Sequence, residues 1–188
     1  VVKSGAYSRS GLFTDYSRPF VEMAGKTLGI IGLGAIGTKV AKIGTAFGMK
    51  VIYYSTSGTN HNTEYPSVPL DRLMREADVI SVHAPYNERT AGLVGERELR
   101  MMKPKAIIMN MGRGGIVVED ALAKVIDEGV IGGAALDVYS VEPIPADHPL
   151  LHTRHPERLS LTPHIAWASV EARERLIQSI ADNIAKGF

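Results

Sequence analysis

Residues 28–37 read Leu-Gly-Ile-Ile-Gly-Leu-Gly-Ala-Ile-Gly, a short apolar run that leads directly into a Gly-x-Gly-x-x-Gly turn. The run predicts a buried strand, and the apolar spacing that continues to Phe47 predicts a helix over 35–47. A strand before the turn and a helix after it are the context in which this pattern binds a dinucleotide. The stretch therefore predicts the first strand, turn and helix of a nucleotide-binding α/β fold.

The three glycines of the turn have different structural roles. Gly32 allows the tight turn, Gly34 lets the backbone approach a pyrophosphate, and Gly37 lets the helix pack closely against the strand. The free amides near Ala35 and Ile36 lie at the positive end of the helix dipole, so we expect them to bind the phosphates.

The rest of the chain repeats this alternation of strand and helix. Nearly continuous apolar runs are typical of parallel strands that are buried on both faces. The expected strands are 28–31, 50–54, 79–83, 106–111, 133–138 and 159–162, and the further helices are 70–76, 96–102, 119–128 and one from Ser169 onward with Val170, Ile177, Ile180 and Ile184 turned inward. We predict an α/β fold, a Rossmann-type doubly wound parallel sheet of about six strands with helices on both faces, in the order 3-2-1-4-5-6.

Composition excludes several classes of partner and site. The 188 residues carry 21 Lys and Arg against 20 Asp and Glu, a net charge of +1, so no nucleic-acid or membrane partner is expected. The absence of cysteine excludes disulfides and thiolate metal sites, and it fits the reducing cytoplasm. Residues 1–25, rich in Ser, Gly and Tyr, predict an arm or linker, and residues 26–188 predict a single dinucleotide-binding domain.

The end of the second predicted strand bears on the choice of cofactor. Tyr54, Ser55 and Thr56 stand where a carboxylate usually binds the adenosine ribose. Without that carboxylate nothing repels a 2′-phosphate, but no arginine stands beside these residues in the sequence to bind one. The sequence therefore favours NAD, and NADP stays open as the alternative.

Three polar segments follow the last three predicted strands. They are Met-Asn-Met-Gly-Arg-Gly-Gly at 109–115, Ala-Leu-Asp-Val-Tyr-Ser-Val-Glu-Pro at 135–143 and Thr-Pro-His-Ile-Ala-Trp at 162–167. Ligands of an open α/β sheet bind outside the carboxyl ends of its strands. We therefore expect the three segments to meet near the reactive end of the cofactor.

The chain resembles the D-isomer-specific 2-hydroxyacid dehydrogenases in the glycine turn and in four later motifs. These are Asn110-x-x-Arg113-Gly114, Leu136-Asp137-Val138, Glu142-Pro143 and Pro163-His164, in the family's order, and the resemblance runs from Ser17-Arg18-Pro19-Phe20 to the last helix. It implies the NAD-binding domain of an oxidoreductase acting on a small D-2-hydroxy acid, glycerate with hydroxypyruvate or lactate with pyruvate. It also implies that most of a substrate domain is absent here, that the arm makes homodimer contacts, and that this chain alone is poorly active.

The resemblance also assigns roles to residues. Arg113 would bind the substrate carboxylate and carbonyl, His164 would be the acid–base, and Glu142 would be its partner. The residues expected to contact the cofactor are Gly32, Gly34, Ala35, Ile36, Gly37, Tyr54, Ser55, Thr56, His83, Ala84, Pro85, Thr90, Met111, Gly112, Arg113, Asp137 and His164. The chemistry fits these types, because a histidine holds a proton near neutral pH, a neighbouring carboxylate favours its charged form, and a guanidinium matches a carboxylate.

Other interpretations stay open. The same fold serves as a nicotinamide-sensing interaction module in corepressors of this family, and formate dehydrogenases share it too. Taken singly, Arg113 could be a surface ion pair and His83 or His164 a packed histidine, but the occurrence of Arg113, Glu142 and His164 together favours an enzyme.

Three histidines near the C-terminal end have the spacing of a metal-binding face. They are His148, His152 and His155, but Pro149 and Pro156 interrupt the segment, and no acid or thiolate completes a site. We therefore expect a solvated loop and no metal.

Overall fold

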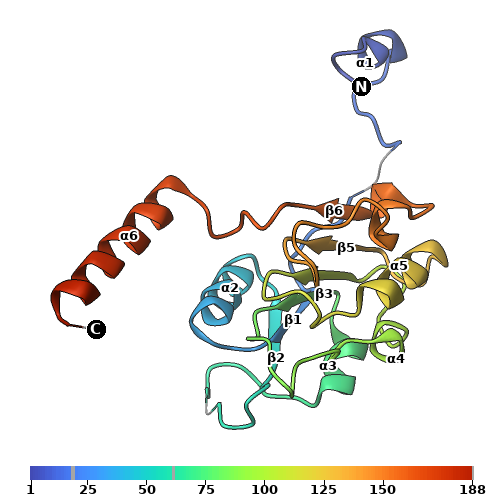
Figure 1. Cartoon of the computed structure of the whole chain (residues 1–188). Coiled ribbons are helices and arrows are strands. Elements are labelled where there is room, and N and C mark those ends of the chain that lie inside the picture. The colour runs from blue at the N-terminus through green and yellow to red at the C-terminus, as the bar shows by residue number, and fades with distance from the viewer. Residues whose placement is uncertain (18–19, 61, 188) are drawn as a thin grey trace.

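The computed structural model describes residues 1–17, 20–60 and 62–187, so the Arg18-Pro19 pair, His61 and Phe188 lie outside the described residues. Within these residues one parallel sheet has the order β2-β1-β3-β4-β5-β6 (Figure 1). The strands are β1 (Thr27–Ile31), β2 (Lys50–Tyr54), β3 (Val79–Val82), β4 (Ile107–Asn110), β5 (Gly133–Leu136) and β6 (Leu159–Leu161). The helices are α1 (Ala6–Ser10), α2 (Ala35–Ala46), α3 (Leu70–Glu76), α4 (Glu96–Leu99), α5 (Glu119–Asp127) and α6 (Val170–Ala185), with short turns η1 (Pro149–Leu151) and η2 (Pro156–Arg158). The Rossmann-type α/β class is confirmed.

The predicted strand order is wrong in one respect. β3 pairs with β1 and not with β2, and the place beyond β2 is taken by a single parallel bridge between Tyr53 and Ser67. The Tyr53 amide donates to the Pro66 carbonyl (3.0 Å), and the Val68 amide donates to the Tyr53 carbonyl (2.8 Å). Counted with this bridge as its third strand, the sheet has the doubly wound order. A strand of one residue leaves no apolar run that could predict it.

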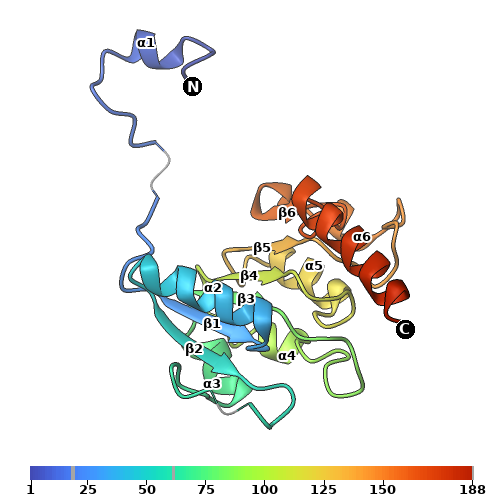
Figure 2. The ribbon, with the colours of Figure 1, turned by 90° about the vertical axis from the view of Figure 1, so that its left-hand side faces the viewer.

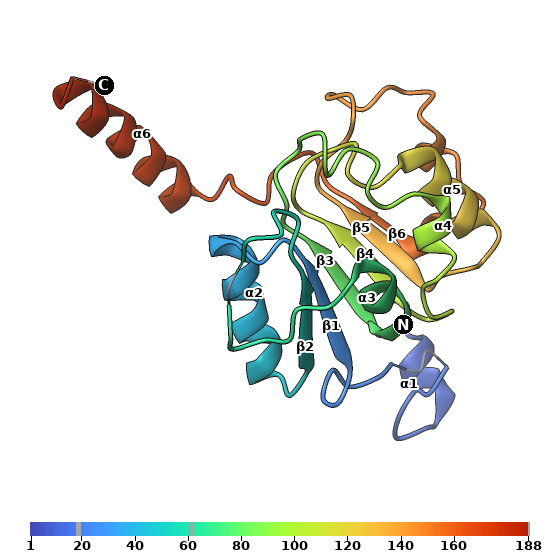
Figure 3. The ribbon, with the colours of Figure 1, turned by 90° about the horizontal axis from the view of Figure 1, so that it is seen from below.

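Helix α2 covers one face of the sheet, and α3, α4 and α5 cover the other (Figures 2 and 3). The residues of α2 that are buried are small: Gly37, Ala41 and Gly44. A Cβ at Gly44 would lie 2.5 Å from Leu28 Cδ2, so the helix backbone packs directly on the Leu28 side chain of β1. The larger apolar residues that predicted the helix point outward: Ile36, Ile43 and Phe47 are 64%, 58% and 59% exposed.

The face under α3 and α5 holds the larger core. Leu122, Val125 and Ile126 of α5 are fully buried, as the periodicity of 119–128 predicts. Leu73 and Met74 of α3 are fully buried as well, and a Cβ at Gly29 of β1 would lie 2.8 Å from Leu73. Removing such apolar area from water supplies the main stabilisation of the sheet. The predicted helix 96–102 is shorter than expected, because α4 ends at Leu99.

The two ends of the chain stand away from the sheet (Figure 1). Ser169 caps α6 as predicted, its side chain accepting from the Ala172 amide at 3.2 Å. The prediction that the apolar residues of α6 turn inward is wrong, because no residue of this helix is buried. Phe13 and Phe20 of the N-terminal arm are 96% and 94% exposed. No helix among the described residues is long and apolar enough to cross a membrane.

Candidate active site

The glycine turn joins β1 to α2 and matches the geometry of a phosphate-binding loop. Gly32 has φ +91°, and its amide donates to the Tyr54 carbonyl at 3.0 Å. A Cβ at Gly37 would lie 2.3 Å from the Gly32 carbonyl oxygen, whereas a Cβ at Gly34 would meet nothing within 4 Å. The turn is thus closed toward the protein and open toward solvent at the start of α2. This open space, next to the free amides of the first helical turn, fits a pyrophosphate.

The ends of β3 and β4 continue the open space away from the turn. One cavity of about 440 Å³ is lined by Ile36, His83, Ala84, Pro85, Tyr86, Met111, Gly112 and Arg113. Burial lowers the pKa of His83, which therefore favours its neutral form. His83 Nε2 lies 2.8 Å from the Ser81 hydroxyl, and its Nδ1 is buried with no hydrogen-bond partner among the described residues. Most of the residues predicted to contact the cofactor at these two strand ends thus share one cavity.

Two predicted cofactor residues lie differently from the others. Thr90 is fully buried, and its hydroxyl donates to the Pro85 carbonyl (2.7 Å). Its side chain therefore fixes the loop after β3 from the protein interior. Tyr54 offers the turn its backbone carbonyl. Ser55 and Thr56 follow it at the end of β2, and Thr56 lines a cleft that also includes Pro85.

Arg113, Glu142 and His164 line one cavity of about 380 Å³. Arg113 follows β4, and its Nη1 donates to the Gly112 carbonyl at 2.8 Å. A Cβ at Gly114 would lie 1.9 Å from the Tyr139 carbonyl carbon, so a glycine is needed where the Arg113 loop crosses the loop after β5. The two loops can therefore lie close enough to bring these side chains together.

Glu142 and His164 form a hydrogen-bonded pair. His164 Nδ1 lies 2.7 Å from Glu142 Oε2, and Glu142 Oε1 accepts from the Tyr139 amide at 2.9 Å. The hydrogen bond with His164, together with the Tyr139 amide, holds the pKa of Glu142 below its usual value. With Nδ1 engaged by a carboxylate, Nε2 is the atom of His164 left to exchange a proton with a ligand. His164 has φ +54°, a left-handed backbone conformation that a residue with a side chain seldom adopts.

Asp137 shapes the His164 loop. It is 2% exposed, and it accepts from the Thr162 hydroxyl (2.6 Å) and from the amides of Ile165 (2.9 Å) and Ala166 (2.8 Å). Burial alone would raise the pKa of Asp137, but these hydrogen bonds outweigh it and the pKa is lowered. Asp137 also lines a cavity of about 580 Å³ with Met111, His164 and Trp167.

Two features of the site had no clear signal in the sequence. Tyr86, which is 57% exposed, lines both the cavity that contains Arg113 and the cavity that contains His83. In the sequence, the only hint of this role is its position directly after Pro85. His148 does not lie in a solvated loop: its Nε2 is 2.9 Å from Glu119 Oε2, and the two side chains are 10% and 5% exposed. That expectation is wrong for His148 because Glu119, 29 positions earlier, is buried and needs a partner. Among the residues described, no three His, Asp or Glu side chains are grouped so as to hold a metal.

Comparison with known proteins agrees with this geometry. The sequence model of the "D-isomer specific 2-hydroxyacid dehydrogenase, NAD binding domain" matches residues 2–166. A glyoxylate reductase of Aeropyrum pernix is 46% identical over 169 residues, 87% of this chain and 49% of that protein. A glycerate dehydrogenase of Methylorubrum extorquens is 38% identical over 97% of this chain and 56% of its own length. The chain thus spans about half the length of these curated relatives.

Solved structures show the same likeness. The crystal structure of a D-lactate dehydrogenase from Aquifex aeolicus, complexed with NAD and lactic acid, superposes with a TM-score of 0.84 at 29% identity. The match covers 99% of this chain and 61% of that one. The glycine turn and the family match agree, and the chain belongs to the D-isomer specific 2-hydroxyacid dehydrogenases, of which it is the NAD-binding domain.

Proposed function

We propose that the protein containing this chain interconverts a small D-2-hydroxy acid and the corresponding 2-keto acid with NAD(H). The substrates proposed are glycerate with hydroxypyruvate or lactate with pyruvate. One observation carries the proposal: Arg113, Glu142 and His164 line a single cavity beside the residues at the ends of β3 and β4. No observation among the described residues favours a sensing module.

When bound, the reduced nicotinamide supplies a hydride for the carbonyl carbon of the substrate. Arg113 binds the substrate carboxylate through its planar fork of N–H groups and stabilises the charge that develops on the carbonyl oxygen. His164, charged and held by Glu142 at Nδ1, donates a proton from Nε2 to that oxygen. In the oxidation direction neutral His164 accepts the proton at the same atom.

The proposed cofactor contacts run from the glycine turn to the cavity at the ends of β3 and β4. The turn from Gly32 to Gly37 binds the pyrophosphate, and Ser55 and Thr56 lie at the adenosine ribose. His83, Pro85 and Met111 border the path toward the nicotinamide. Asp137 acts there by holding the loop that carries His164, since its carboxylate accepts from Ile165 and Ala166.

We also propose that the whole protein is a cytoplasmic homodimer in which the arm of residues 1–25 contributes to the interface. Phe13 and Phe20 expose almost their whole surface here, and a partner would remove that apolar area from water. Changing both to serine in the whole protein is expected to shift its mass in light scattering from dimer toward monomer. A dimer unchanged by the double substitution would contradict the role of the arm.

The catalytic assignment is tested with Arg113→Gln in the whole protein. The change removes the charged fork but keeps an amide of similar reach, so kcat/KM for hydroxypyruvate and pyruvate should fall by about 10²-fold or more. Calorimetric NADH affinity should stay within about twofold, because the glycine turn is untouched. The matched control is Arg154→Gln, an exposed arginine paired with Asp127 of α5. Undiminished turnover by the Arg113 variant would refute the assignment.

A further inference from the structure

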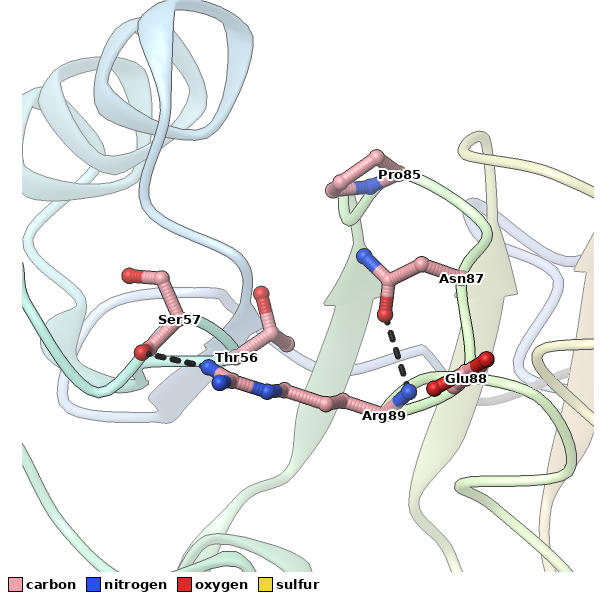
Figure 4. A pocket seen from close by; sticks show the side chains of 6 residues that line it. All are labelled: Thr56, Ser57, Pro85, Asn87, Glu88 and Arg89. Atoms are coloured by element: carbon pink, nitrogen blue, oxygen red, sulfur yellow. Dashed lines mark hydrogen bonds between the residues drawn. The ribbon is translucent and has the colours of Figure 1, made fainter.

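The cleft beside the end of β2 contains a cation that its neighbours in sequence do not supply. Arg89 lies in the loop after β3, and its Nη1 donates to the Ser57 carbonyl at 3.0 Å (Figure 4). No arginine stands beside residues 54–56 in the sequence, but the fold brings Arg89 to Ser57. Chain positions 57 and 89 are 32 residues apart, and the adjacency of β1 to both β2 and β3 brings their loops together.

The guanidinium of Arg89 is free to take a ligand. A guanidinium has five N–H donors, and the bond to Ser57 uses one of them. Across residues 1–17, 20–60 and 62–187, no carboxylate pairs with Arg89 within 4.0 Å. Glu88 lines the same cleft, but Figure 4 shows its carboxylate on the opposite side of the Arg89 backbone from the guanidinium. Among the described residues the Arg89 guanidinium therefore has no ion-pair partner, although the Glu88 carboxylate lines the same cleft.

The loop that carries Arg89 is held in place. The Arg89 amide donates to Asn87 Oδ1 (2.9 Å), and the Asn87 amide donates to Thr90 Oγ1 (2.8 Å). The Thr90 side chain is fully buried under the loop. Because the backbone on both sides of Arg89 is fixed, its side chain starts from a defined position toward β2.

The loop after β2 offers hydroxyl donors to the same cleft. Ser55 Oγ accepts from the Gly58 amide (3.1 Å) and from the Asn60 amide (3.4 Å), and it lies 3.5 Å from Ser57 Oγ, so Ser55 holds the loop together at the edge of the cleft. Thr56 and Ser57 line the cleft itself, which has a volume of about 530 Å³. These groups are donors for an anion, and a carboxylate that would repel one is missing from 55–57.

The cleft is tied to the cofactor-binding turn. The Asn60 side-chain amide donates to the Leu33 carbonyl at 2.7 Å, and the Gly32 amide donates to the Tyr54 carbonyl at 3.0 Å. The loop after β2 is thus hydrogen-bonded directly to the glycine turn. An anion attached to the adenosine ribose of a dinucleotide on this turn would meet Arg89, Thr56 and Ser57, which line the cleft, with Ser55 at its edge.

We propose that this cleft binds the 2′-phosphate of NADP(H), with Arg89 as its cation and Ser55, Thr56 and Ser57 as hydroxyl donors. The chain then takes NADPH at least as tightly as NADH, although it belongs to an NAD-binding family. A phosphate monoester carries a charge of roughly −1.5 to −2 near pH 7, and arginine binds it in a two-pronged geometry. The proposal rests on the proposed function, since it needs a dinucleotide on the glycine turn.

The test is calorimetric titration of the 188-residue chain with NADPH and with NADH. Arg89→Ala should weaken NADPH binding by about 10- to 100-fold, and it should leave NADH binding within about twofold. Arg154→Ala is the matched control, because Arg154 is also exposed and also donates to a backbone carbonyl, that of Asp127. In parallel, 2′,5′-ADP should bind more tightly than 5′-ADP to the unchanged chain and no better than 5′-ADP to the Arg89 variant.

A second variant tests the same cleft by a substitution in the loop after β2. Ser55→Asp places a carboxylate at the end of β2, where it repels a 2′-phosphate, and it should weaken the binding of NADPH much more than the binding of NADH. NADPH binding weaker than NADH binding, or an equal loss of affinity for both dinucleotides in Arg89→Ala, would overturn the inference. If NADH binds and NADPH does not, the inference alone fails. If neither dinucleotide binds, the cofactor site of the proposed function fails with it.

Discussion

Asp137 shows how one buried carboxylate can serve folding and the site together. Its hydrogen bonds to Thr162, Ile165 and Ala166 fix the loop on which His164 sits. Because they lower its pKa, the charged form contributes stability above the ordinary aspartate value, and that contribution is lost as the pH falls toward the lowered value.

We therefore expect Asp137→Asn to lower the free energy of unfolding by about 1–3 kcal/mol at pH 7. The difference from the unchanged chain should stay constant above about pH 5 and shrink as the pH falls from the ordinary aspartate value toward the lowered pKa of Asp137, below which both side chains are neutral. Urea unfolding at a series of pH values measures this. Asp147→Asn, at an exposed position, is the control and should have little effect at any pH. A difference that grows on acidification would contradict the assignment.

Substitutions at two glycines of the turn should affect stability and cofactor binding separately. A Cβ at Gly37 would lie 2.3 Å from the Gly32 carbonyl oxygen, whereas a Cβ at Gly34 would point into open space. Gly37→Ala should therefore lower the melting temperature by several degrees, since overpacking costs about 1–3 kcal/mol. Gly34→Ala should melt like the unchanged chain but bind NADH at least about tenfold more weakly, because its methyl group occupies the space next to the pyrophosphate. Equal melting temperatures for the two variants would refute this distinction.

At the scale of elements, α5 is connected to the catalytic loop by Glu119. Its carboxylate accepts from the Ser140 amide (2.7 Å) and the Ser140 hydroxyl (2.9 Å), and it pairs with His148. Ser140 is the residue after Tyr139, whose amide in turn binds Glu142. The first turn of α5 thus positions the segment that orients Glu142.

Glu119→Ala should leave the His148 ring and the Ser140 amide without their partner, at a cost of about 2–4 kcal/mol of stability. Amide hydrogen exchange should also speed up in segment 139–142, more than in β1. Asp120→Ala, at the exposed neighbouring position of the same helix, is the control. Unchanged exchange in that segment would show that Glu119 serves stability alone.

The elements also show what the sequence can predict and what it cannot. The apolar runs and the buried stripe of α5 are local patterns, so the strands and that helix follow from them. The outward stripe of α2 could not be predicted, because its packing uses Gly37, Ala41 and Gly44 and leaves the larger apolar residues outside. The bridge at Ser67 and the approach of Arg89 to Ser57 depend on the order of the strands, which no single stretch of sequence encodes.

On the scale of the whole molecule, the candidate site is assembled but open to water. Arg113 is exposed and His164 is partly exposed, and the chain covers about half the length of its curated relatives. Catalysis gains from the exclusion of water and from a second wall that orients the substrate. These residues alone bring the three side chains together in a cavity that is open to solvent.

We expect the 188 residues alone to bind NADH but to reduce pyruvate or hydroxypyruvate at least about 10²-fold more slowly than the whole protein. Steady-state assays with both keto acids, set beside calorimetry with NADH, measure the two properties separately. Arg113→Gln in the same chain controls for residual activity that does not involve the site. Turnover equal to that of the whole protein would show that no further enclosure is needed.

Trp167, the one tryptophan of the chain, is 51% exposed and lines the cavity shared by Met111, Asp137 and His164. An indole in that place is a built-in optical reporter. Its emission overlaps the absorption band of reduced nicotinamide, so arrival of the cofactor should quench it by energy transfer without any added dye. Arg89 lines a different cleft, so replacing it should not change the fluorescence of Trp167 in the free protein. A change in quenching on addition of the dinucleotide would then report how much dinucleotide is bound.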